Sequence, residues 1–312
     1  MTSLVGRSVV VRVPATSANL GPGFDTLGLA LSHYDELIVT AVDGSGVTID
    51  VTGVGAGIVA TDESNLVIQA IQHCFTHFSQ TMPALHVAAT NVIPHGGGLG
   101  SSAAAIVSGV MAAKGLLDGV VEMDAATLLV LATELEGHPD NVAPALLGGL
   151  TIAWTTEFGP QAKKLMVHRG VSPLVCVPDF RVSTAHARSL QPDTVPYADA
   201  VYNVSRAALL IAALVQSPEL LLEATGDRLH QDYRAAAMPD TTELIRMLRS
   251  HGHAAVVSGA GPSVLVLADD PAKRLEAMAL VKEHAATPWE CLLLAVDFKG
   301  ATVNEHQVEA ST

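Results

Sequence analysis

A glycine-rich segment between residues 94 and 104 carries the clearest chemical signal in the sequence. Four of the five residues from 96 to 100 are glycine, so the backbone there can turn tightly and come close to a ligand. An alanine-rich, apolar run over 103–117 follows at once and predicts a helix whose first N–H groups and dipole attract anions. No lysine follows the last glycine, so the segment differs from a P-loop, and its glycine spacing differs from the dinucleotide fingerprint. We expect it to bind phosphate groups; glycines used only for turning are the alternative.

Two more glycine-bearing segments lie far from the first one in the chain. Residues 14–25 place Asn19 and Asp25 on a loop held by proline and glycine, where both side chains can hydrogen-bond a polar ligand. Residues 257–263 are mostly small and allow backbone segments to pack closely. Taken singly, either segment could be an ordinary turn or hairpin, because Asn, Asp and Gly are common turn residues.

Composition limits the class of protein to which these segments belong. With 312 residues, 49% of them hydrophobic and 15% charged, the chain can bury a large core and is long enough for two domains. The formal net charge is -14 and the 17 basic residues are spread thinly, so we expect no basic surface for nucleic acid or an anionic membrane. Phosphate binding must then depend on backbone amides and a few local cations.

Cysteine spacing and hydropathy favour a cytoplasmic protein. The three cysteines, Cys74, Cys176 and Cys291, are far apart and odd in number, which favours reduced thiols over disulfides or a zinc site. No apolar stretch reaches the roughly 18 uninterrupted residues of a membrane-spanning helix. The first residues lack the pattern of a signal peptide. We therefore expect no membrane association.

Strand and helix patterns are mixed along the chain without a regular βαβ rhythm, which predicts an α+β fold. Ser64 precedes the first amphipathic run and is the expected helix cap. A boundary near residue 160 gives expected domains 1–160 and 161–312. The expected strands cover 9–13, 36–42, 47–51, 85–89, 148–154, 174–178, 256–258, 265–267 and 290–296, and the expected helices cover 66–78, 103–117, 124–136, 198–215, 218–226, 241–251 and 271–285.

In order and position, the three glycine-bearing segments resemble the three motifs of the GHMP kinases, a family of small-molecule kinases. The pattern Pro-x-x-x-Gly-Leu-Gly-Ser-Ser-Ala-Ala is specific, and the resemblance extends from Val11 to Leu267. It implies a GHMP kinase fold, with an amino-terminal domain like ribosomal protein S5 and a ferredoxin-like carboxy-terminal domain. It also implies that ATP is the phosphate donor and is bound by Pro94, His95, Gly96, Gly97, Gly98, Leu99, Gly100, Ser101, Ser102, Ala103 and Ala104.

Three other segments, 136–149, 184–188 and 229–234, resemble the branch of the family whose acceptor is L-homoserine. Homoserine carries a carboxylate, an ammonium group and a primary hydroxyl, so its site needs cations, acceptors and a means of orienting the hydroxyl. The resemblance implies that Arg188 and Arg234 donate to the carboxylate through their forked guanidinium groups.

The same resemblance implies that Asn19, Asp25 and His138 complete the acceptor pocket, with Asp25 near the reacting hydroxyl. The residues of these three segments also have structural interpretations. Arginines on helices are usually solvated surface charges, His138 could be a buried structural imidazole, and Asp140 could cap a turn.

Phosphoryl transfer from ATP depends on neutralising charge and aligning the reactants. By resemblance, Ser102 and Glu136 are expected to hold Mg2+ through oxygen atoms, with Glu134 as the alternative metal ligand. Asn141 stands where some relatives have an aspartate proposed as a general base. We therefore expect no dedicated base, with orientation and transition-state stabilisation supplying the rate. Thr184 is expected to assist through a hydrogen bond.

Other functions fit parts of the same pattern. The chain could be a GHMP kinase for another small alcohol, a non-catalytic member that binds metabolites, or an unrelated structural protein. The paired arginines and His138 favour an amino acid as the acceptor, and the loop serines with a nearby glutamate favour catalysis. The resemblance also implies a homodimer.

Overall fold

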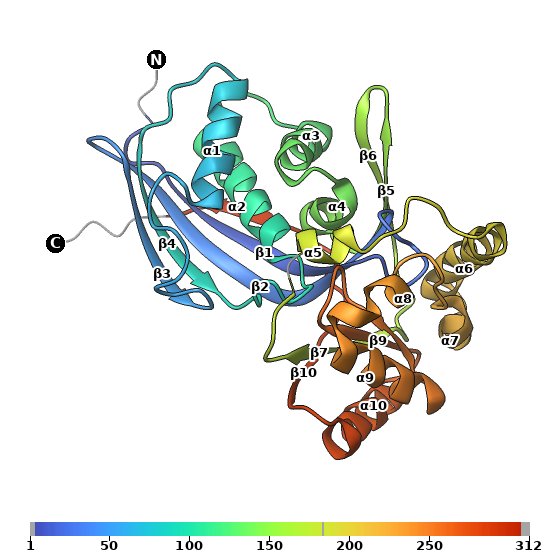
Figure 1. The fold of residues 1–312 in the computed structure, drawn as a ribbon. Helices are drawn as coiled ribbons and strands as arrows, with labels where there is room; N and C mark the ends of the chain where they lie inside the picture. Colours follow the sequence, from blue (N-terminus) through green and yellow to red (C-terminus); the bar gives the residue numbers. More distant parts are fainter. Residues whose placement is uncertain (1–3, 183, 307–312) are drawn as a thin grey trace.

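The computed structural model describes residues 4–182 and 184–306, which form two β-sheets with helices packed against them (Figure 1). The larger sheet and its helices come mainly from the first half of the chain, and the smaller sheet comes from the second half. The expected α+β class is confirmed.

The first sheet has seven strands in the order β11-β1-β2-β4-β3, with β5 paired to β2 and β6 paired to β5. All pairs are antiparallel except β3 with β4. In the edge strand β3, Val and Ile alternate with Thr and Asp, as is usual for a sheet with one solvated face. The strands are β1 (Ser8–Ala18), β2 (Leu27–Val42), β3 (Val47–Gly53), β4 (Ala84–Asn91), β5 (Leu150–Thr156), β6 (Gly159–Leu165) and β11 (Thr302–Glu305).

Four helices cover one face of this sheet: α1 (Leu66–His77), α2 (Ser101–Leu116), α3 (Ala125–Glu136) and α4 (Pro139–Leu147) (Figure 1). Helix α2 lies at the centre and is apolar on nearly all sides, because it is surrounded by other elements. Its small residues allow close packing: a Cβ on Gly109 would lie 2.4 Å from the carbonyl oxygen of Val67 in α1.

The second sheet is antiparallel and has the order β10-β7-β9-β8. Helices α9 (Pro239–Ser250) and α10 (Pro271–His284) pack against it. The chain therefore runs strand, helix, strand, strand, helix, strand, which is the ferredoxin-like arrangement expected for this half. The strands are β7 (Ser172–Pro178), β8 (Ala254–Val257), β9 (Val264–Ala268) and β10 (Trp289–Leu293).

A helical segment is inserted between β7 and α9. Its main helix, α6, is long and apolar enough by composition to cross a membrane, and 22% of its most apolar 18-residue window is buried. One such helix is weak evidence for a membrane, and two charged residues on α6 form ion pairs, Asp199 with Arg228 and Arg206 with Glu223. The inserted elements are α5 (Thr184–Ser189), α6 (Tyr197–Val215), η1 (Pro218–Leu220), α7 (Leu221–Ala224), α8 (Gln231–Arg234) and η2 (Ala235–Ala237).

The elements differ from the expected ones in several places: helix α4 was not expected, and β2 begins at Leu27 instead of residue 36. Asn65, not Ser64, caps α1, because the Asn65 side chain accepts from the Val67 N–H whereas the Ser64 hydroxyl bonds Asp62. Strands β6 and β11 were not expected, since β6 contains proline and two lysines and both strands form by pairing with β5 and β1. The boundary expected at residue 160 falls inside β6, so the first sheet takes strands from both halves.

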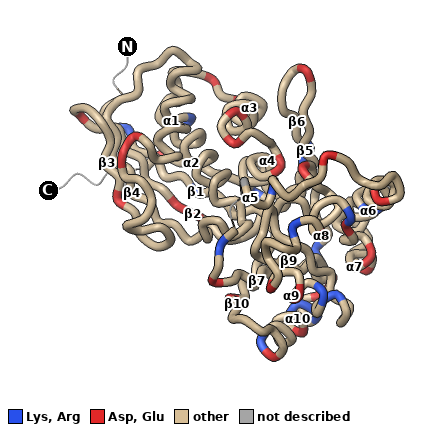
Figure 2. Tube along the Cα trace, in the orientation of Figure 1, with Lys and Arg blue, Asp and Glu red and all other residues tan. Residues whose placement is uncertain are grey.

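Basic residues gather mainly around α9 and α10 (Figure 2). Several of them are paired with acids: Arg246 with Glu243, and Lys273 with Asp269 at 2.7 Å. These pairs neutralise part of the local positive charge.

Candidate active site

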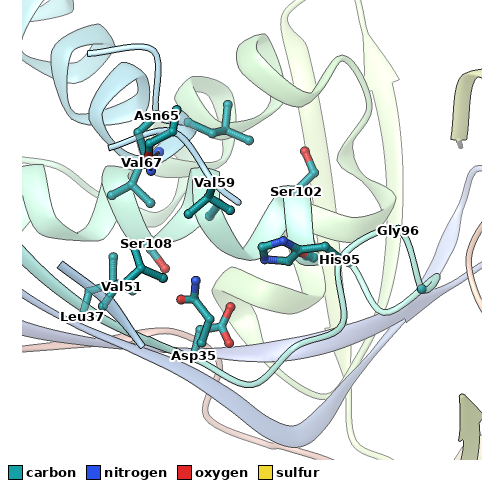
Figure 3. A pocket seen from close by; sticks show the side chains of 18 of the residues that line it. Asp35, Leu37, Val51, Val59, Asn65, Val67, His95, Gly96, Ser102 and Ser108 are labelled. Carbon is teal, nitrogen blue, oxygen red and sulfur yellow. Dashed lines mark hydrogen bonds between the residues drawn. The ribbon is translucent and has the colours of Figure 1, made fainter. Parts of the chain in front are cut away.

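A cavity of about 450 Å³ lies between the first sheet and helices α1 and α2, beside the glycine-rich loop (Figure 3). One end is formed by this loop and by the start of α2. The middle is mostly apolar and is lined by side chains from β2, β3, β4, the first turn of α1 and the loop before it. These apolar residues are Leu37, Ile49, Val51, Val59, Val67, Val87 and Ala89.

The glycines of the loop are required by its geometry. Gly96, Gly98 and Gly100 have φ values of 65°, 77° and 69°, which favour glycine. A Cβ on Gly98 would lie 2.3 Å from the carbonyl oxygen of Ser258, and one on Gly100 would lie 2.0 Å from Thr16 Oγ1. Gly100 is the N-cap of α2 and no side chain among residues 4–182 and 184–306 caps that end, so its first N–H groups are available to an anion.

Seven of the eleven residues expected to bind ATP line this cavity: His95, Gly96, Gly97, Gly98, Gly100, Ser101 and Ser102. The other four, Pro94, Leu99, Ala103 and Ala104, are not part of the cavity wall. Leu99, Ala103 and Ala104 are fully buried in the hydrophobic core, where they anchor the loop and the first turn of α2.

The two residues expected to hold a metal lie side by side at the loop end of the cavity. Ser102 Oγ donates to Glu136 Oε2 at 2.8 Å, and both residues line the cavity. Burial raises the pKa of Glu136, a shift that the Ser102 hydrogen bond opposes. Glu134 points elsewhere, because its Oε2 is 2.8 Å from His73 Nε2 on α1. Two adjacent oxygen donors suit Mg2+, which completes its shell with water and phosphate oxygens.

Asn141 on α4 borders the same end of the cavity. Its Oδ1 accepts a hydrogen bond of 2.9 Å from Thr16 Oγ1, and Thr16 is fully buried on β1. The Thr16 N–H also donates to the Leu99 carbonyl, which ties β1 to the glycine-rich loop. Within the described part of the chain, nothing bonds the Asn141 Nδ2 group, so Thr16 fixes the amide with its N–H donors left for a ligand.

The acceptor residues from the first loop form a connected set. Asn19 and Asp25 have φ values of 71° and 51°, a conformation that Asn and Asp tolerate better than most residues. Asn19 Oδ1 accepts from the Asp25 N–H at 2.9 Å, and Asn19 Nδ2 donates to the Gly259 carbonyl at 2.8 Å. The Asp25 carboxylate then meets Arg188 Nη2 of α5 at 3.2 Å. Since Gly259 lines the cavity, this set lies at its edge.

Arg234 on α8 belongs to the same set but is buried, with 2% of its surface exposed. Its guanidinium lies 5.2 Å from the centre of the Phe24 ring, and Nη1 is 3.5 Å from the Gly259 carbonyl. Burial lowers the pKa of Arg234, and the nearby Asp25 opposes this shift whereas Arg188 adds to it. Two guanidinium groups and one carboxylate therefore share a small region next to the cavity.

His138 lies at the start of α4, between Glu136 and Asn141 in the chain. Its Nδ1 is 2.8 Å from Asp140 Oδ1, and the Asp140 side chain is almost completely buried. This hydrogen bond raises the pKa of His138. The pairing leaves Nε2 of the ring as the atom that can meet a ligand.

Comparison with known proteins agrees with this geometry. The family model described as GHMP kinases N terminal domain matches residues 65–149, and the model described as GHMP kinases C terminal matches residues 208–285. The chain is 70% identical over 298 residues to the homoserine kinase of Clavibacter michiganensis subsp. michiganensis, covering 96% of this chain and 94% of that protein. The chain belongs to the GHMP kinase family.

Other GHMP kinases show the same relationship. The homoserine kinase of Leifsonia xyli subsp. xyli is 65% identical, with 96% of this chain and 93% of that protein covered. The crystal structure of homoserine kinase from Cytophaga hutchinsonii superposes with a TM-score of 0.85 at 28% identity, covering 96% of this chain and 98% of that one. The expected GHMP kinase fold is confirmed.

Sequence reasoning about this GHMP kinase missed some residues of the site. Thr16 was inside a highlighted segment, but nothing in the sequence indicated that its hydroxyl holds Asn141. Asp35 lines the cavity from the middle of β2, where its position gave no local signal. Thr184, expected to assist the reaction, is the first residue of α5, and its side chain lies outside the described part of the structure.

Proposed function

We propose that this chain is a homoserine kinase, which transfers the γ-phosphoryl group of ATP to the side-chain hydroxyl of L-homoserine and so contributes to threonine biosynthesis. One observation carries the proposal: Arg188, Arg234 and Asp25 lie together at the edge of the cavity that contains the glycine-rich loop. The names of the relatives, which are 46% to 70% identical, support the same activity.

The nucleotide half of the site is proposed to hold Mg-ATP. The free N–H groups at the start of α2 and the loop around Gly98 would bind the phosphates. Ser102 and Glu136 would hold Mg2+, and the pairing of Glu134 with His73 favours Glu136 as the metal ligand. When bound, the ion would offset charge on the transferring phosphoryl group.

The acceptor half matches the charges of an amino-acid zwitterion. The guanidinium groups of Arg188 and Arg234 would donate to the substrate carboxylate, and Asp25 would lie near the reacting hydroxyl and orient it. Asn19 holds Asp25 in place through the Asp25 N–H. His138, fixed by Asp140, would present Nε2 to the substrate. This arrangement would leave the hydroxyl end of the substrate directed at the phosphate loop.

In the reaction, the acceptor oxygen forms a bond to the γ-phosphorus while the bond from that phosphorus to the β–γ bridging oxygen breaks. The hydroxyl proton leaves to solvent or to a phosphate oxygen, since no residue is assigned as a dedicated base. Asn141 would donate its Nδ2 hydrogens to the transferring group or the hydroxyl. Thr184 is proposed to add a hydrogen bond. Alignment and charge stabilisation would supply the rate.

Three further features are part of the proposal. The expected domains 1–160 and 161–312 would act as two units, with the division shifted to the end of β6, with β11 returning to the first unit, and with the site at their junction. The enzyme would work in the cytoplasm, and it would form a homodimer.

The direct test is ADP release in the presence and absence of L-homoserine, with the product identified by 31P NMR. We expect ADP release to depend on homoserine and to yield O-phosphohomoserine in equal amount. A panel containing mevalonate, galactose, L-serine and L-threonine should give much slower turnover. ADP release that does not depend on homoserine would contradict homoserine as the acceptor. Faster turnover of another alcohol would make that alcohol the acceptor.

A further inference from the structure

The part of the cavity between β2 and α2, its inner end, contains two buried polar side chains in a mostly apolar wall. Asp35 comes from β2 and Ser108 from α2, on opposite walls, and both direct oxygen atoms into the cavity (Figure 3). Asp35 is 5% exposed and Ser108 is 1% exposed. Buried polar groups are costly when they lack partners, so each one here needs an explanation.

Among the described residues, only one oxygen of Asp35 is hydrogen-bonded. Oδ1 accepts from the N–H groups of Val92 at 2.7 Å and Ile93 at 3.0 Å, which fixes the carboxylate beneath the glycine-rich loop. Within the described residues, no hydrogen bond reaches Oδ2. A fixed carboxylate with one free oxygen is an acceptor that faces the cavity.

Ser108 is similar. Its Oγ is buried and has no hydrogen-bond partner among the described residues. Of the other polar side chains nearby, Asn65 bonds Val67 and Ala60 through both ends of its amide, Ser64 bonds Asp62, and Asn91 donates to the Val54 carbonyl at 3.4 Å. Asp35 and Ser108 differ from the polar residues around them because both are buried and each has an oxygen atom without a partner among the described residues.

Their position identifies the part of the ligand that they would meet. Ser108 lies six residues beyond Ser102 on α2, or about 9 Å along the helix. With the phosphates at the start of α2, the sugar and base of the nucleotide must occupy the space that continues from there. That space is walled by Leu37, Val51 and Val67, which suit the face of a base.

We propose that this inner end of the cavity reads the 6-position of the purine ring: Asp35 Oδ2 accepts a hydrogen bond from the exocyclic amino group of adenine, and the Ser108 hydroxyl bonds a neighbouring ring nitrogen. The inference deepens the proposed function and rests on it only for the binding of a nucleotide. A 6-oxo purine would place an acceptor against an acceptor, leaving both buried and unpaired.

The deciding experiment is calorimetric binding of ADP and IDP to the intact protein and to Asp35→Asn. In this variant Oδ1 can still accept from Val92 and Ile93, while an NH2 group replaces the free oxygen. We expect the wild type to prefer ADP over IDP by roughly tenfold or more. Asp35→Asn should bind ADP more weakly, bind IDP more tightly, and reverse or abolish the preference.

Two variants complete the test. Ser108→Ala should weaken ADP and IDP together, because a hydroxyl can donate or accept. Asp50→Asn is the matched control: Asp50 also lies on the first sheet, but it faces outward and pairs with His86, so nucleotide preference should not change. Thermal melting of each variant establishes that the protein is folded.

Other outcomes would overturn the proposal. An unchanged ADP-to-IDP ratio in folded Asp35→Asn would remove Asp35 from base recognition, and a changed ratio of 2′-deoxy-ADP to ADP would place it at the sugar. If Asp35→Asn does not fold, wild-type binding of N6,N6-dimethyl-ADP decides, since a nucleotide without amino hydrogens must lose the same roughly tenfold. Because binding is measured without homoserine, failure here is distinct from failure of homoserine phosphorylation.

Discussion

The nucleotide half and the acceptor half of the site are built in different ways. The first depends on backbone from one continuous segment, residues 95–102, whose glycines adopt conformations and close contacts that other residues cannot. The second depends on side chains from four separate segments, represented by Asp25, His138, Arg188 and Arg234. A continuous backbone site resists most side-chain changes but not an added Cβ, whereas an assembled side-chain site is sensitive at each contributing residue.

Within the acceptor half, the two arginines also differ. Arg234 is buried against Phe24, whereas 42% of the Arg188 side chain is exposed. A charge pair is stronger where water is excluded, so Arg234 should contribute more to binding than Arg188. Substitutions in the two halves should therefore change different kinetic constants, and substitutions of the two arginines should change homoserine binding to different extents.

The largest expected effect is that of Arg234→Ala on the acceptor half. Loss of a desolvated guanidinium should weaken the binding free energy of homoserine by about 2–5 kcal/mol, which raises its KM, while the KM for ATP changes little. Steady-state kinetics with each substrate varied in turn measure both values. Arg228→Ala is the matched control, since Arg228 is on the neighbouring turn but half exposed and paired with Asp199. Equal losses for both substrates would contradict the division into halves.

Ser102→Ala should act on the nucleotide half and come next in size. Loss of a hydroxyl beside Glu136 should raise the activation free energy by about 1.5–3 kcal/mol, which lowers kcat. It should also raise the Mg2+ concentration needed for half-maximal rate. A magnesium titration of turnover measures both effects. Ser205→Ala, on the exposed face of α6, controls for the loss of a hydroxyl. Normal turnover and normal magnesium dependence would exclude Ser102 from the metal site.

Thr16→Val tests the point where the two halves meet and should have a smaller effect. Without the Thr16 hydroxyl, the Asn141 amide can rotate. The activation free energy should then rise by about 0.5–1.5 kcal/mol, so kcat should fall while both KM values stay close to normal. Thr16→Ser keeps the donor and should restore most of the rate. Thr48→Val is the control at an exposed strand position. A rise in either KM without a change in kcat would indicate a binding role instead.

The smallest change expected is in the titration of His138. Asp140 accepts its Nδ1–H and raises the pKa of His138, so the stability from this pair is present at low pH and lost as pH rises through that raised pKa. Asp140→Asn should lower the pKa, as measured by NMR titration of the His138 ring protons. An unchanged pKa in the variant would show that another group sets it. Asp50→Asn should leave the His138 titration as it is.

The same contrast explains how much the sequence could predict. The glycine-rich loop and α2 are local, so composition and order along the chain were enough to predict a phosphate site there. Arg188 and Arg234 could be assigned only by resemblance, because no local pattern shows that two distant helices meet. The Thr16 contact with Asn141 spans 125 positions and depends on the pairing of β1 with the rest of the sheet.

Strands β6 and β11 were missed for a related reason. Neither has a strong strand pattern, and each forms because an edge is available, β5 for one and β1 for the other. Asp35 was missed because a carboxylate inside a strand usually faces solvent, and only the tertiary structure shows that it faces the cavity.

The return of β11 to the first sheet affects how the protein is made. During translation, residues 302–305 leave the ribosome after every other strand of the first sheet, and β1 has an open edge until they arrive. An unpaired strand edge is a template for pairing between chains. A fragment ending after β6 would keep that edge permanently, so the nucleotide-binding half is completed only when β11 has been synthesised.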